Sequence, residues 1–278
     1  MPYLTVPDTP AAIELHYQDV GQGDPVVLIH GWPLSGRSWE AQIAPLVDAG
    51  YRVVTYDRRG FGGSSQPWTG YDYNRFSQDL EALLVKLDLK KVTLVGFSMG
   101  GGEVARYLGM YGSKRIARAV FAAAVTPYRL KAADNPEGKV TKADIAERQS
   151  SITKDRLAFL EAFSKNFYAD AKGKLLVSEA QRQYTFMMAA FASPKGTHDC
   201  IAAFSGTDFR ADLAKISIPT LVIHGDSDQI VPLADSGTRT HQAVKGSQMH
   251  VIKGGPHGCN LSHAEEFNQV LIDFLRAT

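Results

Sequence analysis

The sequence predicts an α/β fold with a mostly parallel central sheet, helices on both faces and a helical insertion. Three observations lead to this prediction. Short apolar runs recur along the chain, amphipathic helical stripes lie between them, and one long stretch breaks the alternation. Parallel strands are buried on both faces and therefore read as continuous apolar runs. Their alternation with helices indicates crossover connections between parallel strands.

The expected strands are short and rich in Val, Ile and Leu. The start of the chain, residues 1–21, is also strand-like, because apolar and polar residues alternate there. The remaining strands are expected at 26–29, 51–56, 92–95, 119–123, 221–223 and 249–252.

Helices are expected between and after these strands. Apolar residues three and four apart share one face of a helix, and this spacing recurs in three places. The second of these three helices should run from about Gly101 to Tyr111. The first helix carries the stripe Phe76, Leu80, Leu83 and Leu87. The last helix carries the stripe Phe267, Val270, Leu271 and Phe274.

The alternation of strands and helices breaks between residues 126 and 207. Helical segments are expected there at 153–167 and 178–191, with polar turns and no strand pattern. We therefore divide the chain into a core formed by 1–125 and 208–278 and a helical cap formed by 126–207. Within the cap, Phe159, Phe163 and Phe167 repeat at every fourth position and form either a core stripe or a wall of an apolar pocket.

Composition narrows the function classes. The 278 residues carry 30 Lys+Arg and 29 Asp+Glu, a net charge of +1, without the basic cluster that nucleic acid or an anionic membrane would require. Two cysteines are too few for a disulfide framework or a Cys-rich metal site. No apolar run reaches the ~20 residues of a membrane helix, and the start lacks signal-peptide features. We expect a cytoplasmic protein without metal or cofactor, and the oligomeric state stays open.

Ser98 is the candidate nucleophile. The segment Gly96-Phe97-Ser98-Met99-Gly100 lies between an expected strand and an expected helix, where it must form a sharp and strained turn. A β-carbon on either flanking residue would collide, which explains the two glycines. The turn lifts the hydroxyl clear of the sheet and places the Met99 N–H at the positive end of a helix.

A serine nucleophile needs a base and a carboxylate that orients it. After this turn, the expected chain order is serine, acid, histidine. His257 is the favoured base, because it lies in a glycine loop after a strand, at the carboxyl edge where catalytic groups gather. His224 and His250 lie inside strand-like runs and are expected to be packed there, and His263 begins the last helix.

The acid is expected in the loop 224–232, after the preceding strand. Asp226 and Asp228 compete for this role, and spacing alone does not separate them. The loop 30–36, after the first central strand, should supply a second oxyanion donor. There, a glycine allows the chain to bend so that the N–H groups of Trp32 and Met99 can both donate to the same oxyanion.

Five segments in register resemble one family, the α/β hydrolases, and more narrowly the bacterial cofactor-free (non-haem) haloperoxidases and the arylesterases similar to them. The resemblance extends from the first strand to the last helix and is weakest over the cap. Its segments are HGWPLSG (30–36), YDRRGFGGSS (56–65), VGFSMGGGE (95–103), HGDSDQIVP (224–232) and GGPHGCN (254–260).

The resemblance implies an α/β-hydrolase fold and a Ser98–Asp228–His257 triad, since the second aspartate of G-D-x-D serves in this family. It also implies Trp32 and Met99 as the oxyanion pair. Asp57 and Arg59 are expected to be scaffold residues. Pro33 is informative, because family members named as haloperoxidases carry proline after the oxyanion aromatic residue.

The implied chemistry is acyl transfer through a Ser98 ester. Water would release an acid, and hydrogen peroxide would release a peracid that oxidises halide. The substrate is expected to be a small, mainly apolar carboxylic ester or a carboxylic acid. It would contact Trp32, Pro33, Ile230, Phe159 and Phe163. The same triad would also serve an amidase or a lactamase, and the fold also serves as a non-catalytic ligand receptor.

Overall fold

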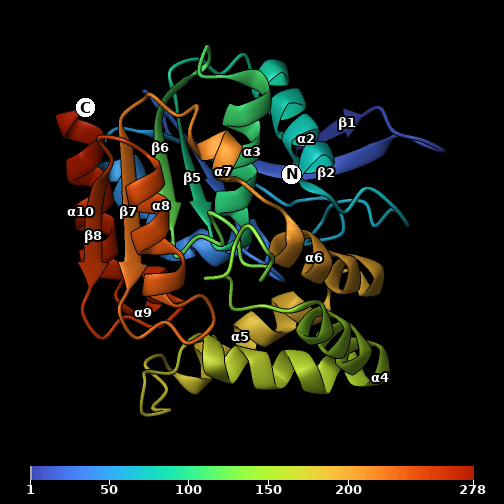
Figure 1. The fold of residues 1–278 in the computed structure, drawn as a ribbon. Coiled ribbons are helices and arrows are strands. Elements are labelled where there is room, and N and C mark those ends of the chain that lie inside the picture. The colour runs from blue at the N-terminus through green and yellow to red at the C-terminus, as the bar shows by residue number, and fades with distance from the viewer. Residues whose placement is uncertain (1) are drawn as a thin grey trace.

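The computed structural model describes residues 2–278, which form one sheet covered by helices (Figure 1). The sheet order is β1-β2-β4-β3-β5-β6-β7-β8. β2 pairs antiparallel with β1 and β4, and all other neighbours are parallel. The six strands expected between residues 26 and 252 are confirmed and form the parallel part of the sheet. The strands are β1 (Tyr3–Val6), β2 (Ile13–Val20), β3 (Pro25–Ile29), β4 (Arg52–Tyr56), β5 (Val92–Phe97), β6 (Ile116–Ala122), β7 (Thr220–Gly225) and β8 (Gln248–Ile252).

The strand-like start of the chain differs from the expectation in one respect. It forms two strands, β1 and β2, which pair antiparallel with Tyr3 opposite His16 and Val6 opposite Ile13. Pro7 and Pro10 lie between the two strands. Since proline has no N–H to donate to a ladder, the pairing is interrupted there and the chain reverses.

Helices cover both faces of the sheet. The buried side chains of α2, α3, α7 and α8 belong to one apolar cluster, and those of α1, α9 and α10 belong to a second. These helices are α1 (Glu40–Asp48), α2 (Tyr73–Lys86), α3 (Met99–Tyr111), α7 (Arg210–Leu213), α8 (Gly237–Ala243, with Ala243 in the cluster), α9 (Cys259–Ser262) and α10 (Ala264–Ala277). Two single 3₁₀ turns lie at Gly36–Trp39 and Leu233–Asp235.

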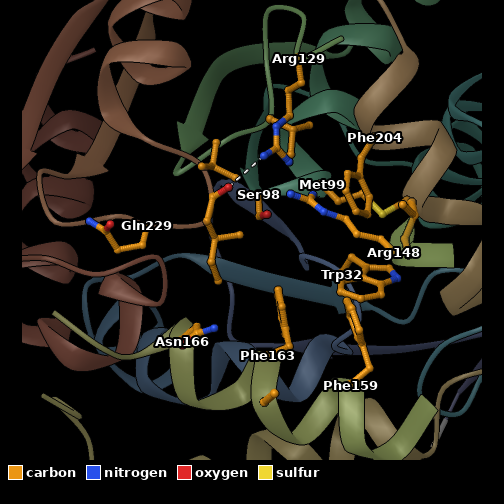
Figure 2. Close-up of a pocket in the computed structure, with 15 residues that line it drawn as sticks. Trp32, Ser98, Met99, Arg129, Arg148, Phe159, Phe163, Asn166, Phe204 and Gln229 are labelled. Carbon is orange, nitrogen blue, oxygen red and sulfur yellow. Dashed lines mark hydrogen bonds between the residues drawn. The ribbon is translucent and has the colours of Figure 1, made fainter. Parts of the chain in front are cut away.

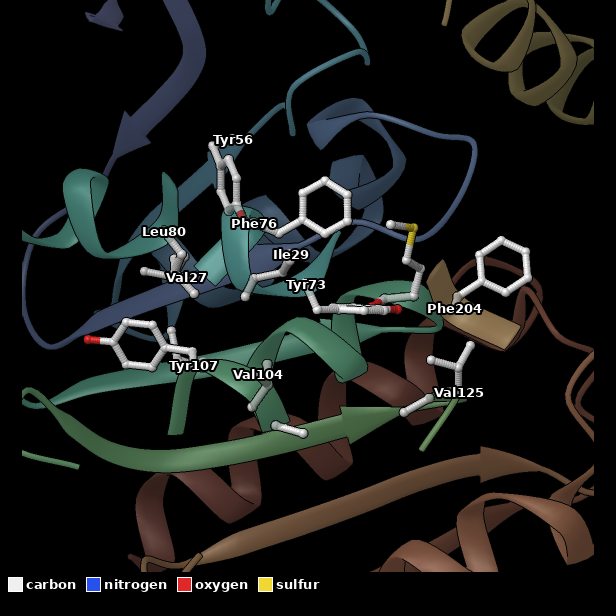
Figure 3. Packing of buried hydrophobic residues seen from close by; sticks show 14 of the residues in the cluster. Val27, Ile29, Tyr56, Tyr73, Phe76, Leu80, Val104, Tyr107, Val125 and Phe204 are labelled. Carbon is white, nitrogen blue, oxygen red and sulfur yellow. The ribbon is translucent and has the colours of Figure 1, made fainter. Parts of the chain in front are cut away.

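The central strand β3 shows how the core is divided. Successive side chains of a strand point to opposite faces. Val27 and Ile29 therefore pack with the α2 and α3 residues drawn in Figure 3, including Phe76 and Val104. Val26 and Leu28 pack on the other face with the α1 and α10 side. Burial on both faces explains why the strands read as continuous apolar runs.

Three helices follow β6 and lie at the carboxyl edge of the parallel strands (Figure 1). They are α4 (Lys142–Phe167), α5 (Glu179–Ala190) and α6 (Pro194–Gly206), and α4 contacts both of the others. The sequence did not predict α6, although Ser193 caps it and Pro194 occupies its first turn. No helix among residues 2–278 is both long and apolar enough to span a membrane.

Helix α4 begins earlier than the expected segment 153–167. Its angles are interrupted at Asp155 (φ −155°, ψ 89°), and the Asp155 carboxylate accepts the N–H of Ala158. The expected segment therefore corresponds to the second half of α4. The first half starts with a capping box between Thr141 and Asp144, a start signal that the apolar periodicity did not reveal.

Candidate active site

Ser98 occupies the turn between β5 and α3, where the sequence predicted it. Its backbone angles are φ 52° and ψ −116°, a conformation that residues other than glycine rarely adopt. A β-carbon on Gly96 would overlap the Gly100 carbonyl, and a β-carbon on Gly100 would overlap the carbonyl of Ile29. The close approach of β5, α3 and β3 therefore requires both glycines and forces the turn that presents Ser98.

Ser98, His257 and Asp228 are joined by two hydrogen bonds. Nε2 of His257 lies 2.9 Å from Oγ of Ser98, and Nδ1 of His257 lies 2.7 Å from Oδ2 of Asp228. Asp228 lies in the loop after β7 and His257 in the loop after β8. The ends of three parallel strands thus bring the residues together, and all three side chains are buried.

Asp228 is held in its ionised form. Its Oδ1 accepts the N–H groups of Ile230 and Val231, each at 2.8 Å, and Nε2 of His224 lies 3.3 Å from its Oδ2. Burial disfavours the charge, but the proximity of His257 and the hydrogen bonds of His224 and His257 hold the pKa of Asp228 below its usual range. His224 is buried, as expected for a strand residue, and it also supports the acid.

Asp226 has a different environment from Asp228. It is exposed, and its Oδ1 accepts the N–H of Gly254 at 2.7 Å and the hydroxyl of Ser227 at 3.3 Å. These bonds connect the loop after β7 to the loop that leads to His257. The geometry therefore gives Asp226 a loop-bracing role and places Asp228 against the histidine.

At the cavity, the backbone N–H groups of Trp32 and Met99 have no hydrogen-bond acceptor among residues 2–278. Met99 begins α3, so its N–H points from the positive end of the helix. A β-carbon on Gly31 would lie 3.1 Å from Cβ of Ser98, which shows how closely this loop approaches the serine. The Trp32 indole donates to the Thr197 carbonyl at 3.1 Å and so fixes the loop against α6.

A cavity of about 280 Å³ opens onto Ser98 (Figure 2). The predicted residues Trp32, Ile230, Phe159 and Phe163 line it, whereas Pro33 is buried and does not. The rings of Trp32 and Phe163 meet edge to face with centroids 5.1 Å apart. The third residue of the phenylalanine stripe, Phe167, instead packs against the His257 ring at 5.0 Å.

Sequence reasoning missed several residues of the cavity. Some carried a local signal, because they follow β6 at its carboxyl end or flank Asp228. Those contributed by α4 and α6 reach the cavity only through the packing of these helices, which no local pattern shows. The missed residues are Val125, Arg129, Arg148, Ala162, Asn166, Ile201, Phe204, Gln229 and Val231.

Asp57 and Arg59 make contacts internal to the scaffold, as expected. The Asp57 carboxylate accepts the N–H groups of Gly36 at 2.7 Å and Gly63 at 2.8 Å. Arg59 donates from Nε to Asp79 at 2.6 Å. Neither residue lines the cavity at Ser98.

The chain is similar to known proteins over its whole length. Residues 24–264 match the family described as alpha/beta hydrolase fold. A crystal structure of a bromoperoxidase from Bacillus anthracis is 58% identical, has a TM-score of 0.95 and covers 99% of this chain and 100% of its own. A non-haem chloroperoxidase of Kitasatospora aureofaciens is 40% identical over 99% of both chains. A bifunctional esterase/perhydrolase of Acinetobacter calcoaceticus is 36% identical over 100% of both.

Proposed function

Because the chain belongs to the α/β-hydrolase family, and within it to the non-haem haloperoxidase branch, we propose that it is a serine hydrolase of small carboxylic esters with perhydrolase activity. Ser98 is the nucleophile, His257 the base and Asp228 the residue that orients the base. The observation that carries this proposal is the unbroken pair of hydrogen bonds from Ser98 through His257 to Asp228.

Acylation uses the geometry of these three residues directly. Oγ of Ser98 attacks the ester carbonyl while Nε2 of His257 takes its proton, and Asp228 stabilises the resulting imidazolium. The tetrahedral oxyanion accepts the unpaired N–H groups of Trp32 and Met99, and each such donor contributes about 3–4 kcal/mol to transition-state stabilisation. His257 then donates its proton to the leaving alcohol, and the acyl group remains on Ser98.

Deacylation decides between two products. Water attacks the acyl-enzyme with His257 as base and releases a carboxylic acid and free Ser98. Hydrogen peroxide attacks in the same way and releases a peracid. The peracid then oxidises halide to hypohalite and returns to the carboxylic acid, so halogenation needs only the acyl-enzyme and peroxide. A relative named as an esterase/perhydrolase supports this pairing of activities.

The cavity supports an acyl group that is mainly apolar. Trp32, Phe159 and Phe163 provide aromatic walls, and Ile230 closes another side. Two of these walls come from α4, so we propose that residues 126–207 act as a cap that shapes the substrate site. Pro33, being buried, would act through the position of Trp32 rather than through contact with the substrate.

Product partitioning tests the proposal. The protein receives an activated acetyl ester and a fixed excess of hydrogen peroxide, and peracetate and acetate are quantified. Ser98→Ala is the test variant and Ser150→Ala, an exposed serine of α4, is the matched control. We expect both products from wild type and control, and less than about 1% of either from Ser98→Ala. Retained turnover in folded Ser98→Ala would refute the nucleophile, and acetate without peracetate would refute the perhydrolase activity.

A further inference from the structure

Two arginines face the cavity that opens onto Ser98. Arg129 extends from the segment after β6, and Arg148 extends from α4 (Figure 2). The walls around them are largely apolar, with rings such as Trp32 and Phe163. Two like charges in an apolar cavity repel each other, and both lose hydration. Such an arrangement calls for a compensating group.

Arg129 remains charged without a carboxylate partner. Its Nη2 donates to the Ile230 carbonyl at 2.9 Å, and no ion pair to Arg129 is found within residues 2–278. Burial, followed by repulsion from Arg148, lowers the pKa of Arg129 to about 10, and attraction to Asp228 and Asp235 offsets only part of this. At neutral pH the guanidinium is therefore still protonated, and its other N–H groups are available to a ligand.

Arg148 has even fewer partners. Its side chain has no hydrogen bond and no ion pair within 4 Å in the part of the chain that the structure describes. Its charge acts on Asp144, one helical turn earlier, whose pKa is lowered first by hydrogen bonds to Thr141 and further by Arg148. The hydrogen bonds with Thr141 hold the Asp144 side chain at the start of α4, and it forms no ion pair with Arg148.

The buried arginines of this protein are paired, whereas Arg129 and Arg148 are half-buried. Arg58 donates to Glu103 at 2.8 Å, and Arg59 donates to Asp79 and Asp8, each at 2.6 Å. The chain therefore supplies a carboxylate where a guanidinium is enclosed by the scaffold. At the cavity, Asp228 attracts Arg129 without forming an ion pair and is itself hydrogen-bonded to His257. No carboxylate among residues 2–278 forms an ion pair with Arg129 or Arg148, which leaves that position for the carboxylate of a ligand.

We propose that the preferred substrate is an ester that carries a second, unreacting carboxylate, bound between Arg129 and Arg148 while Ser98 attacks the ester carbonyl. This inference rests on the proposed hydrolase function and names its substrate class. The aromatic walls hold the carbon chain and the arginines hold its charged end. A cavity of about 280 Å³ suits a chain of a few carbons. The mainly apolar substrate expected from the sequence thus gains one charged end.

The test compares esters that differ in one charge. Monoethyl glutarate, with the carboxylate on the acyl side, is matched by ethyl pentanoate. 3-Acetoxypropanoate, with the carboxylate on the alcohol side, is matched by propyl acetate. We expect kcat/KM of wild type to be at least about tenfold higher for one of the anionic esters than for its neutral match, the usual scale for a hydrogen-bonded charge. A preference for monoethyl glutarate would show that the acyl side of the ester faces the arginines, and a preference for 3-acetoxypropanoate would show that the alcohol side does.

Arg148→Met is the decisive variant, because Arg148 has no partner that its loss would leave unpaired. The ratio of kcat/KM for the anionic and neutral esters should fall severalfold in Arg148→Met, where only Arg129 remains, and be better kept in Arg148→Lys. Arg276→Met, an exposed arginine of α10, carries the same charge change and should keep the wild-type ratio. A wild-type ratio near 1, or a ratio that Arg148→Met leaves at its wild-type value, overturns the inference.

A binding measurement separates this inference from the proposed function. Calorimetric titration of glutarate into Ser98→Ala, with and without Arg148→Met, needs no turnover. Glutarate binding that depends on Arg148 supports the carboxylate site even where no ester is hydrolysed, and the hydrolase proposal alone would then fail. Ser98-dependent hydrolysis of neutral esters without glutarate binding would refute the carboxylate site alone.

Discussion

Arg58 and Glu103 form a fully buried ion pair directly behind the candidate active site. Nε of Arg58 donates to Oε2 of Glu103 at 2.8 Å, and both side chains are wholly shielded from solvent. Nη2 of Arg58 also donates to the His30 carbonyl at 3.0 Å. Since His30 precedes the loop that carries Trp32 and Glu103 belongs to α3, this pair connects the two elements that supply the proposed oxyanion donors.

Glu103→Gln should therefore lower both stability and turnover. The amide keeps the shape but leaves the Arg58 charge buried without its counter-charge, which costs about 3–5 kcal/mol. Urea unfolding measures this cost. Both kcat and KM should change, because the loop that shifts carries Trp32, which supplies an oxyanion donor and also a wall of the cavity. Asp19→Asn, which breaks the partly exposed pair with Arg52, is the control and should cost about 1 kcal/mol or less. Equal costs for the two variants would contradict this account.

Asp228→Asn should remove nearly all activity, whereas Asp226→Asn should not. An amide at 228 no longer stabilises the imidazolium and favours the wrong tautomer of His257, which lowers kcat by about 10⁴-fold. Asp226 braces the loop at Gly254, so its amide should reduce kcat only a few-fold. Steady-state hydrolysis of an activated ester measures both variants. The reverse order of effects would assign the acid to Asp226.

Gly100→Ala should destabilise the protein, although most glycine-to-alanine changes inside a helix stabilise it. The new β-carbon would meet the carbonyl oxygens of Ile29 and His30, which are backbone atoms and do not move aside. Gly206, in the last turn of α6, has no atom within 4 Å of such a β-carbon and is the control. Thermal unfolding should show a lower Tm for Gly100→Ala and a gain of up to about 1 kcal/mol for Gly206→Ala. A stabilised Gly100→Ala would show that the turn is less tightly packed than the structure has it.

The sequence revealed the parts of the site that local geometry determines. Ser98 was recognisable because a strand, a tight turn and a helix follow one another within a few residues. His257 was recognisable because a strand end precedes it. Asp226 and Asp228 were not separable by spacing, since both occupy one loop. The family resemblance implied Asp228, and the fold shows that the Asp228 carboxylate meets the histidine while Asp226 binds the Gly254 N–H.

The cavity walls were harder to predict, for a physical reason. Phe159 and Phe163 were found from their spacing along one helix face. Arg148 lies on the same helix, before the interruption at Asp155, so its approach to the cavity depends on the bend and on how α4 packs over the sheet. A charged residue at helical spacing reads as solvent-exposed unless that packing is known.

Phe163→Ala should change the acyl-chain preference, because its ring lies against Trp32 and forms one wall of the cavity. Removal of the ring lengthens the apolar space, and each additional buried methylene contributes about 0.8 kcal/mol, or roughly fourfold in kcat/KM. The profile across p-nitrophenyl esters from acetate to octanoate should shift toward longer chains. Phe191→Ala, in a residue that is 72% exposed and outside the cavity, should leave the profile unchanged. A profile that Phe163→Ala does not move would show that the acyl chain lies along a different wall, and the same esters assayed with Phe204→Ala would then locate it on the α6 side.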